Sequence, residues 1–151
     1  MAETKTANHI ALLAPVPEVH LESALRELKD SMVAFASRDW ELFRRLDNER
    51  KGLPVEVYIY ASRSDGFDGM ASWHAIYAYQ SDEEHKVKQF RPSSTNSDVL
   101  NGDIFWVVQK LRRLEPVEQR PVAGFEPYGK SGHAYGHAFP PHRPLLVEYP
   151  L

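Results

Sequence analysis

The sequence of 151 residues contains no cysteine and no apolar run long enough to cross a membrane. The absence of cysteine excludes disulfide bridges, thiolate-bound zinc, iron–sulfur clusters and thiol nucleophiles. The apolar stretch from Ile10 to Val16 is interrupted by Pro15, whereas a transmembrane helix needs about 20 apolar residues. We therefore expect a cytoplasmic protein with no membrane segment.

Charge of one sign is also scarce, since 18 basic residues stand against 21 acidic ones, a net charge of −3. Such a balance argues against a protein that coats nucleic acid through bulk charge. The chain has no glycine-rich phosphate loop, no G-x-S-x-G elbow, no H-E-x-x-H pair and no dinucleotide fingerprint. Function is therefore expected to reside in a local site, and no cofactor is expected.

The remaining composition is that of a folded globular protein, with 42% hydrophobic and 26% charged residues. The length predicts one domain over residues 1–151. We expect residues 1–7 to be flexible and residues 121–144, in which glycine and proline are frequent, to be rich in loops.

Two amphipathic helices are predicted in the first third of the chain. The first begins after Pro17, because proline and the acidic residue after it suit a first helical turn. An apolar stripe at helical spacing follows, made of Leu21, Leu25, Leu28 and Met32. The second helix is expected to turn three apolar side chains inward, namely Trp40, Phe43 and Leu46.

Residues 32–36 either prolong the first helix or form a short strand. We favour the strand, because the polar pair Asp30 and Ser31 interrupts the helical pattern. A strand also leaves Ser37 or Asp39 in place as the N-terminal cap of the second helix. Gly52 and Pro54 then end that helix.

Further strands are predicted at residues 9–14, 55–62, 70–80, 104–111 and 145–149. The clearest is 55–62, in which Val55, Val57 and Ile59 alternate with polar and aromatic residues. A sheet of many short strands with aromatics on both faces tends to close on itself. We therefore predict an α+β fold, a mainly antiparallel small β-barrel with the two helices packed against it.

Three segments resemble the PUA-like superfamily of small β-barrels, in particular EVE- and ASCH-type domains. They are the strand and turn from Val55 to Arg63, the strand from Met70 to Tyr77, and the turn and strand from Asn101 to Trp106. The G-x-K-x-x-E-x-R signature of ASCH domains is absent. The resemblance implies a noncatalytic pocket at the barrel mouth that accepts a nucleotide or a modified base, free or displayed on RNA or DNA.

Aromatic side chains with hydrogen-bonding neighbours are the predicted means of binding, because flat rings stack nucleobases and polar groups read their edges or phosphate. Transferred by position from the resemblance, the predicted ligand-binding residues are Ser37, Trp40, Tyr60, Ser62, Arg63 and Trp73. The alternative is that these aromatics form the core. Basic residues that include Arg44 and Arg45 form either a phosphate-binding face or an ordinary solvated surface.

Two other functions remain open. A small hydrolase acting on a nucleoside-like amide or ester would use His74 as general base, although a hydrogen-bonded structural role for this histidine is favoured. A protein-interaction domain would present the aromatic face to a partner. We expect no metal site at His133, His137 and His142, because glycine and proline around them oppose a helix.

Overall fold

The computed structural model describes residues 6–7, 9–28, 31–62, 69–93, 104–128 and 144–149. Within these ranges the α-helices are α1 (Glu18–Glu27) and α2 (Trp40–Glu49). The strands are β1 (Ile10–Pro17), β2 (Val33–Ser37), β3 (Val55–Ser62), β4 (Met70–Ala71), β5 (Trp73–Ser81), β6 (Ile104–Arg113), β7 (Arg120–Pro121) and β8 (Leu145–Glu148). Short 3₁₀ turns are η1 (Glu84–Lys86), η2 (Lys88–Phe90), η4 (Pro116–Glu118) and η5 (Val122–Gly124).

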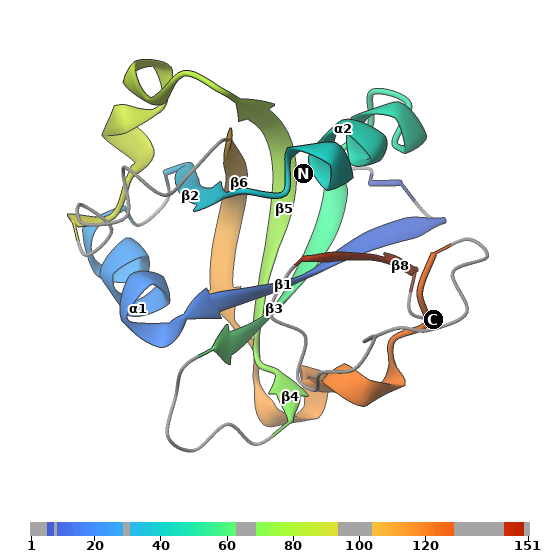
Figure 1. Ribbon diagram of the computed structural model, residues 1–151. Helices are drawn as coiled ribbons and strands as arrows, with labels where there is room; N and C mark the ends of the chain where they lie inside the picture. The colour runs from blue at the N-terminus through green and yellow to red at the C-terminus, as the bar shows by residue number, and fades with distance from the viewer. Residues whose placement is uncertain are drawn as a thin grey trace, which may run out of the picture.

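Six strands form one sheet in the order β2-β6-β5-β3-β1-β8. The pair β1 and β3 is parallel, and every other neighbouring pair of this sheet is antiparallel. Figure 1 shows β1 and β8 running across the direction of β5 and β6, so the sheet is strongly twisted. The predicted α+β class is confirmed.

The small barrel is not confirmed. In the part of the chain that the structure describes, β2 and β8 are the two edges of an open sheet and do not pair with each other. Aromatic residues on both faces of the sheet led us to expect that it closes into a barrel. They lie on both faces for another reason, because other parts of the chain cover each face.

The first face of the sheet carries both helices and the larger core. Val57 and Ile59 of β3 point toward it, as their alternation predicts. From α2, Phe43 is buried against Trp106 of β6, with 5.6 Å between ring centroids. Leu21 of α1 is buried in the same cluster.

The second face is covered by irregular segments. Tyr58 and Tyr60 of β3 pack there with Val122 and Phe125, which follow β7. Farther along the sheet, Val87 between η1 and η2 is buried in a cluster on β2 and β6. The segment after β5, which is rich in charged residues, thus contributes one buried apolar side chain to the core.

A β-bulge interrupts the alternation of β5. Tyr77 pairs with Val108 and Tyr79 pairs with Val107, so β5 has one residue more than β6 at this place. Tyr77 therefore lies in the helix-side core, whereas Tyr79 packs against the opposite cluster. At the end of β5, the bulge therefore changes which side chains point to which face of the sheet. A strict alternation of faces along the strand does not predict this order.

The strand predicted between the helices and the predicted end of α2 are confirmed, whereas the stripe predicted for α1 holds only in part, because Leu21 is buried, Leu25 is exposed and Met32 lies beyond the helix. β2 occupies the segment for which we favoured a strand, and α2 follows it after two residues. Lys51 and Gly52 have positive φ angles of 52° and 80°, so the chain after α2 turns through the left-handed region that glycine tolerates. No helix among the described residues has the length and apolarity needed to cross a membrane.

Candidate functional site

Two of the residues predicted to bind a ligand, Trp73 and Tyr60, lie on opposite faces of the sheet. Trp73 pairs with Ile59 in register and is fully buried in the helix-side core. Tyr60, the next residue of β3, is fully buried on the opposite face. Because neighbouring residues of a strand point to opposite faces, these two rings cannot enclose a base between them.

Of the polar residues predicted to bind a ligand, only Ser37 has a side chain that the structure describes. The Ser37 hydroxyl accepts a hydrogen bond from the Asp39 amide at 3.0 Å, which orders the turn between β2 and α2. Ser62 ends β3, but its side chain lies outside the described residues, and so does Arg63.

Trp40 is the predicted residue that stays available. We expected its side chain to point inward with Phe43 and Leu46, and this is wrong, because 45% of the Trp40 surface is exposed. Trp40 is the first residue of α2, whereas the buried Phe43 and Leu46 belong to the following turns.

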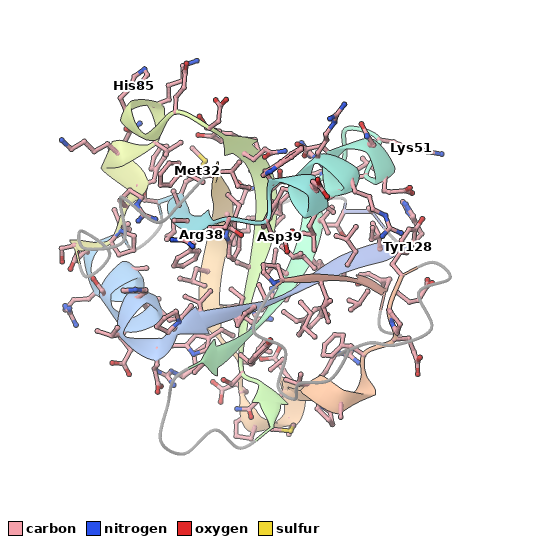
Figure 2. The ribbon with its side chains drawn as sticks, in the orientation of Figure 1. Met32, Arg38, Asp39, Lys51, His85 and Tyr128 are labelled. Carbon is pink, nitrogen blue, oxygen red and sulfur yellow. The ribbon has the colours of Figure 1, made fainter. Side chains whose placement is uncertain are left out.

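A groove of about 890 Å³ opens beside Trp40, which is within the size range of small-molecule sites. Its walls come from the start of α2, the end of β5 and the residues that follow β5. In Figure 1 the arrowhead of β5 lies between α2 and the η1–η2 segment. Figure 2 marks the two sides with Asp39 before α2 and His85 in η1. The lining residues are Trp40, Arg44, Tyr79, Gln80, Ser81, Asp82, Lys86 and Ile104.

The lining combines flat rings, positive charge and hydrogen-bonding groups. Trp40 and Tyr79 provide the rings, and Arg44 and Lys86 provide the charge. Among the described residues Arg44 makes no ion pair, whereas Lys86 pairs with Glu83, and that hydrogen bond raises the pKa of the lysine. The groove can therefore hold a planar ligand that carries an anionic group.

Asp47 holds Gln80, one of the lining residues of the groove, by a hydrogen bond. Its Oδ1 accepts hydrogen bonds from the Tyr77 hydroxyl and from Arg50 Nε, each at 2.9 Å. Its Oδ2 accepts a hydrogen bond from Gln80 Nε2 at 2.7 Å. Burial, together with the negative charge of Asp47, raises the pKa of Tyr77, which stays a neutral donor. One carboxylate thus ties α2 to the end of β5.

No family model, curated protein or solved structure matches this chain. Sequence reasoning grouped Tyr79 with Trp40 among the aromatic residues, but it missed Gln80, Asp82 and Lys86 as neighbours of Trp40. Their only sequence signal is a polar and charged stretch directly after a strand, and the bulge that turns Tyr79 and Gln80 has no clear signal.

A second polar cluster lies on the face of the sheet away from the helices. His74 Nε2 and Glu56 Oε1 form a hydrogen bond of 3.0 Å, and the other Glu56 oxygen accepts hydrogen bonds from Thr6 and Tyr149. The bond to Glu56 raises the pKa of Tyr149 to about 12. Glu56 therefore joins segments near both ends of the described chain to the middle of the sheet.

His74 is mostly enclosed, since 12% of its side chain is exposed. Burial lowers the pKa of His74, and the hydrogen bond to Glu56 opposes this effect only in part. Among the described residues no group of three or more side chains is placed to hold a metal ion. His133, His137 and His142 lie outside these residues.

Folding stability is expected to fall as the pH drops below the ordinary histidine value of 6.5. Below that pH the unfolded chain binds a proton at His74 that the folded chain does not bind, so protonation favours unfolding. Urea titrations between about pH 5 and about pH 8 measure the effect. His74→Gln, which keeps a neutral donor for Glu56, should show a smaller loss over this range. An equal loss in both proteins would contradict the assignment to His74.

Proposed function

We propose that this chain is a noncatalytic module that binds a nucleotide or a nucleobase in the groove between α2 and the end of β5. The observation that carries the proposal is Trp40, which is half-exposed in a groove that also contains a second aromatic ring and two cations. The base would stack on the Trp40 ring, and Arg44 and Lys86 would meet the phosphate.

The magnitudes suit such a ligand. Stacking of a base on an aromatic side chain contributes about 1–3 kcal/mol. A guanidinium donates parallel hydrogen bonds to phosphate oxygens, and Arg44 has no competing carboxylate among the described residues. Together these groups provide affinity for the flat and the charged parts of a nucleotide.

The resemblance to PUA-like domains supports the same function, since it implies recognition of a base. The position of both helices between β1 and β3 agrees with the plan on which the resemblance rests. We infer that the open sheet is a PUA-like sheet, and that the site uses Trp40 rather than Trp73 and Tyr60 as its aromatic wall. The proposal covers a base that is free and a base that is displayed on RNA or DNA.

Tryptophan fluorescence tests the proposal directly. The chain has three tryptophans, of which Trp73 and Trp106 are buried, so quenching by a ligand reports mainly on Trp40. We expect the four ribonucleoside monophosphates, taken as probes, to include at least one that quenches the emission with saturation. Trp40→Ala should weaken binding, measured by calorimetry, about tenfold or more, which corresponds to the loss of one stacked base. Trp40→Phe should retain most of the affinity.

The contribution of charge is tested by two neighbouring arginines. Arg44→Ala should weaken nucleotide binding and reduce its dependence on salt, because Arg44 lines the groove. Arg45→Ala removes the same charge from the next position of α2, where Arg45 contacts the carbonyl oxygen and the ring of Tyr128 instead. Binding by Arg45→Ala should match the unaltered protein. Equal weakening in both variants would show that only general charge matters and would contradict the site.

The hydrolase remains a second candidate because of one observation, the hydrogen bond between Glu56 and His74. A carboxylate in this position orients an imidazole and stabilises its protonated form, as a general base requires. Its test is turnover of nucleoside amides and esters by the unaltered protein and by His74→Gln. Absence of turnover by the unaltered protein would remove this candidate without affecting the groove.

A further inference from the structure

We propose that the groove selects guanine and takes it as a free mononucleotide rather than as part of a nucleic acid chain. The inference rests on the proposed function, since it concerns the ligand of the same groove. It follows from the hydrogen-bonding groups of Gln80 and Asp82 and from the charges around them.

The orientation of the Gln80 amide is determined by its partner. Asp47 Oδ2 is 2.7 Å from Gln80 Nε2, and a carboxylate accepts hydrogen bonds but has none to donate. The amide nitrogen must therefore face Asp47, which leaves the carbonyl oxygen on the other side of the planar amide group. Gln80 lines the groove, so it presents an acceptor to a ligand there.

Asp82 adds two more acceptor oxygens two residues later. It lines the same groove, at the point where the chain leaves β5, and its side chain is exposed. The groove thus has acceptors at the end of β5, near the two aromatic rings. A base that stacks on Trp40 could direct its edge toward these acceptors.

Guanine is the base that matches adjacent acceptors. Its pairing edge carries two neighbouring donors, the N1–H and the 2-amino group, so that a carboxylate can accept from both. In adenine and cytosine the amino donor stands beside a ring nitrogen that accepts, which would face a carboxylate oxygen unfavourably. Uracil has a single N–H between two carbonyl oxygens. The acceptors of the groove therefore favour guanine over the other three bases.

The charges favour a single phosphate group over a chain of them. Arg44 and Lys86 are the cations of the lining, and they are offset by Asp82 and by Glu83, which pairs with Lys86. The protein as a whole has a net charge of −3. Affinity for a nucleic acid chain depends on several phosphate contacts at once, whereas the lining of the groove offers two cations. A single phosphate group near Arg44 would be enough to balance the positive charge in the groove.

Calorimetric titrations with GMP, IMP, AMP and guanosine test both parts. IMP lacks only the 2-amino group of GMP, and guanosine lacks only the phosphate. We expect GMP to bind about tenfold more tightly than IMP and AMP, which is the usual discrimination of a paired hydrogen bond. Guanosine should bind more weakly than GMP, and a short single-stranded oligonucleotide containing guanine should bind no more tightly than GMP at about 0.15 M salt.

Two variants identify the residue responsible. Asp82→Asn replaces one acceptor oxygen by a donor and should remove the preference for GMP over IMP. Glu83→Gln is the matched control, because Glu83 is the next acidic residue and does not line the groove. It should keep the preference between the bases.

The outcomes separate this inference from the proposed function. Equal binding of GMP, IMP and AMP would overturn the guanine preference and leave nucleotide binding intact. Tighter binding of the oligonucleotide than of GMP would overturn the proposal that the ligand is a free mononucleotide. If no nucleotide binds or quenches Trp40, the proposed function itself is wrong.

Discussion

Trp73→Ala is expected to lower the free energy of unfolding by about 3–5 kcal/mol, the usual cost of removing a large buried aromatic side chain. Trp73 is fully buried in the helix-side core. The Arg113 guanidinium lies 4.4 Å from the centre of its ring and approaches Glu18 and Glu22 of α1 at 3.8 and 3.5 Å. Removal of the ring therefore leaves a cavity and also deprives Arg113 of its support, which loosens α1. Urea denaturation of the variant and of the unaltered protein measures the difference.

Two other substitutions serve as controls for Trp73. Trp40→Ala should change the free energy of unfolding by less than about 1 kcal/mol, because much of its surface is already in water. Trp73→Phe should cost much less than Trp73→Ala, since it keeps an aromatic ring. The indole nitrogen of Trp73 has no hydrogen-bond partner among the described residues, so phenylalanine loses no such bond there. A large effect of Trp40→Ala on folding, or a small one of Trp73→Ala, would reverse the assignment of core and site.

Asp47→Ala is the second substitution with a large expected effect. It removes the acceptor of three hydrogen bonds, and it leaves the buried Tyr77 hydroxyl without a partner. An unsatisfied buried donor and the loss of bonds to a charged acceptor are expected to cost about 2–3 kcal/mol in all. The Gln80 amide also becomes free to rotate, so the preference between GMP and AMP should weaken in the same variant.

A double-mutant cycle with Tyr77→Phe isolates the role of the buried hydroxyl. In the Tyr77→Phe background there is no hydroxyl to leave unsatisfied, so Asp47→Ala should cost less than it does alone. Thermal or urea unfolding of the four proteins gives the coupling. Strictly additive effects would show that the hydrogen bond of 2.9 Å between Tyr77 and Asp47 contributes nothing to folding.

The sequence signals located most of the elements, because these depend on local chemistry. The alternation of Val55, Val57 and Ile59 predicted both the strand and its inward face. The interruption at Asp30 and Ser31 predicted a short strand before α2, and the structure has β2 there. These signals act within a few residues and need no knowledge of the partner strand.

The candidate site was predicted less well, because it depends on contacts between distant segments. Trp73 has polar neighbours in the sequence and Tyr60 comes two residues before Ser62, yet the register of β3 with β5 buries the two rings on opposite faces. Trp40 fits the helical stripe of Phe43 and Leu46, but it lies where the helix begins and the groove opens. The bulge after Tyr77 changes the directions in which the Tyr79 and Gln80 side chains point. The periodicity of the sequence alone cannot show such a change.

The neighbours of β1 have a consequence for how the chain folds. β1 is fully paired only when β3 lies on one side of it and β8 on the other. β3 follows β1 after two helices and a strand, and β8 is the last strand along the described chain. During synthesis one edge of β1 therefore stays without its partner strand until β8 has been made. Contacts so distant along the chain slow folding, so exposure of β1 before β8 emerges is the step most open to aggregation.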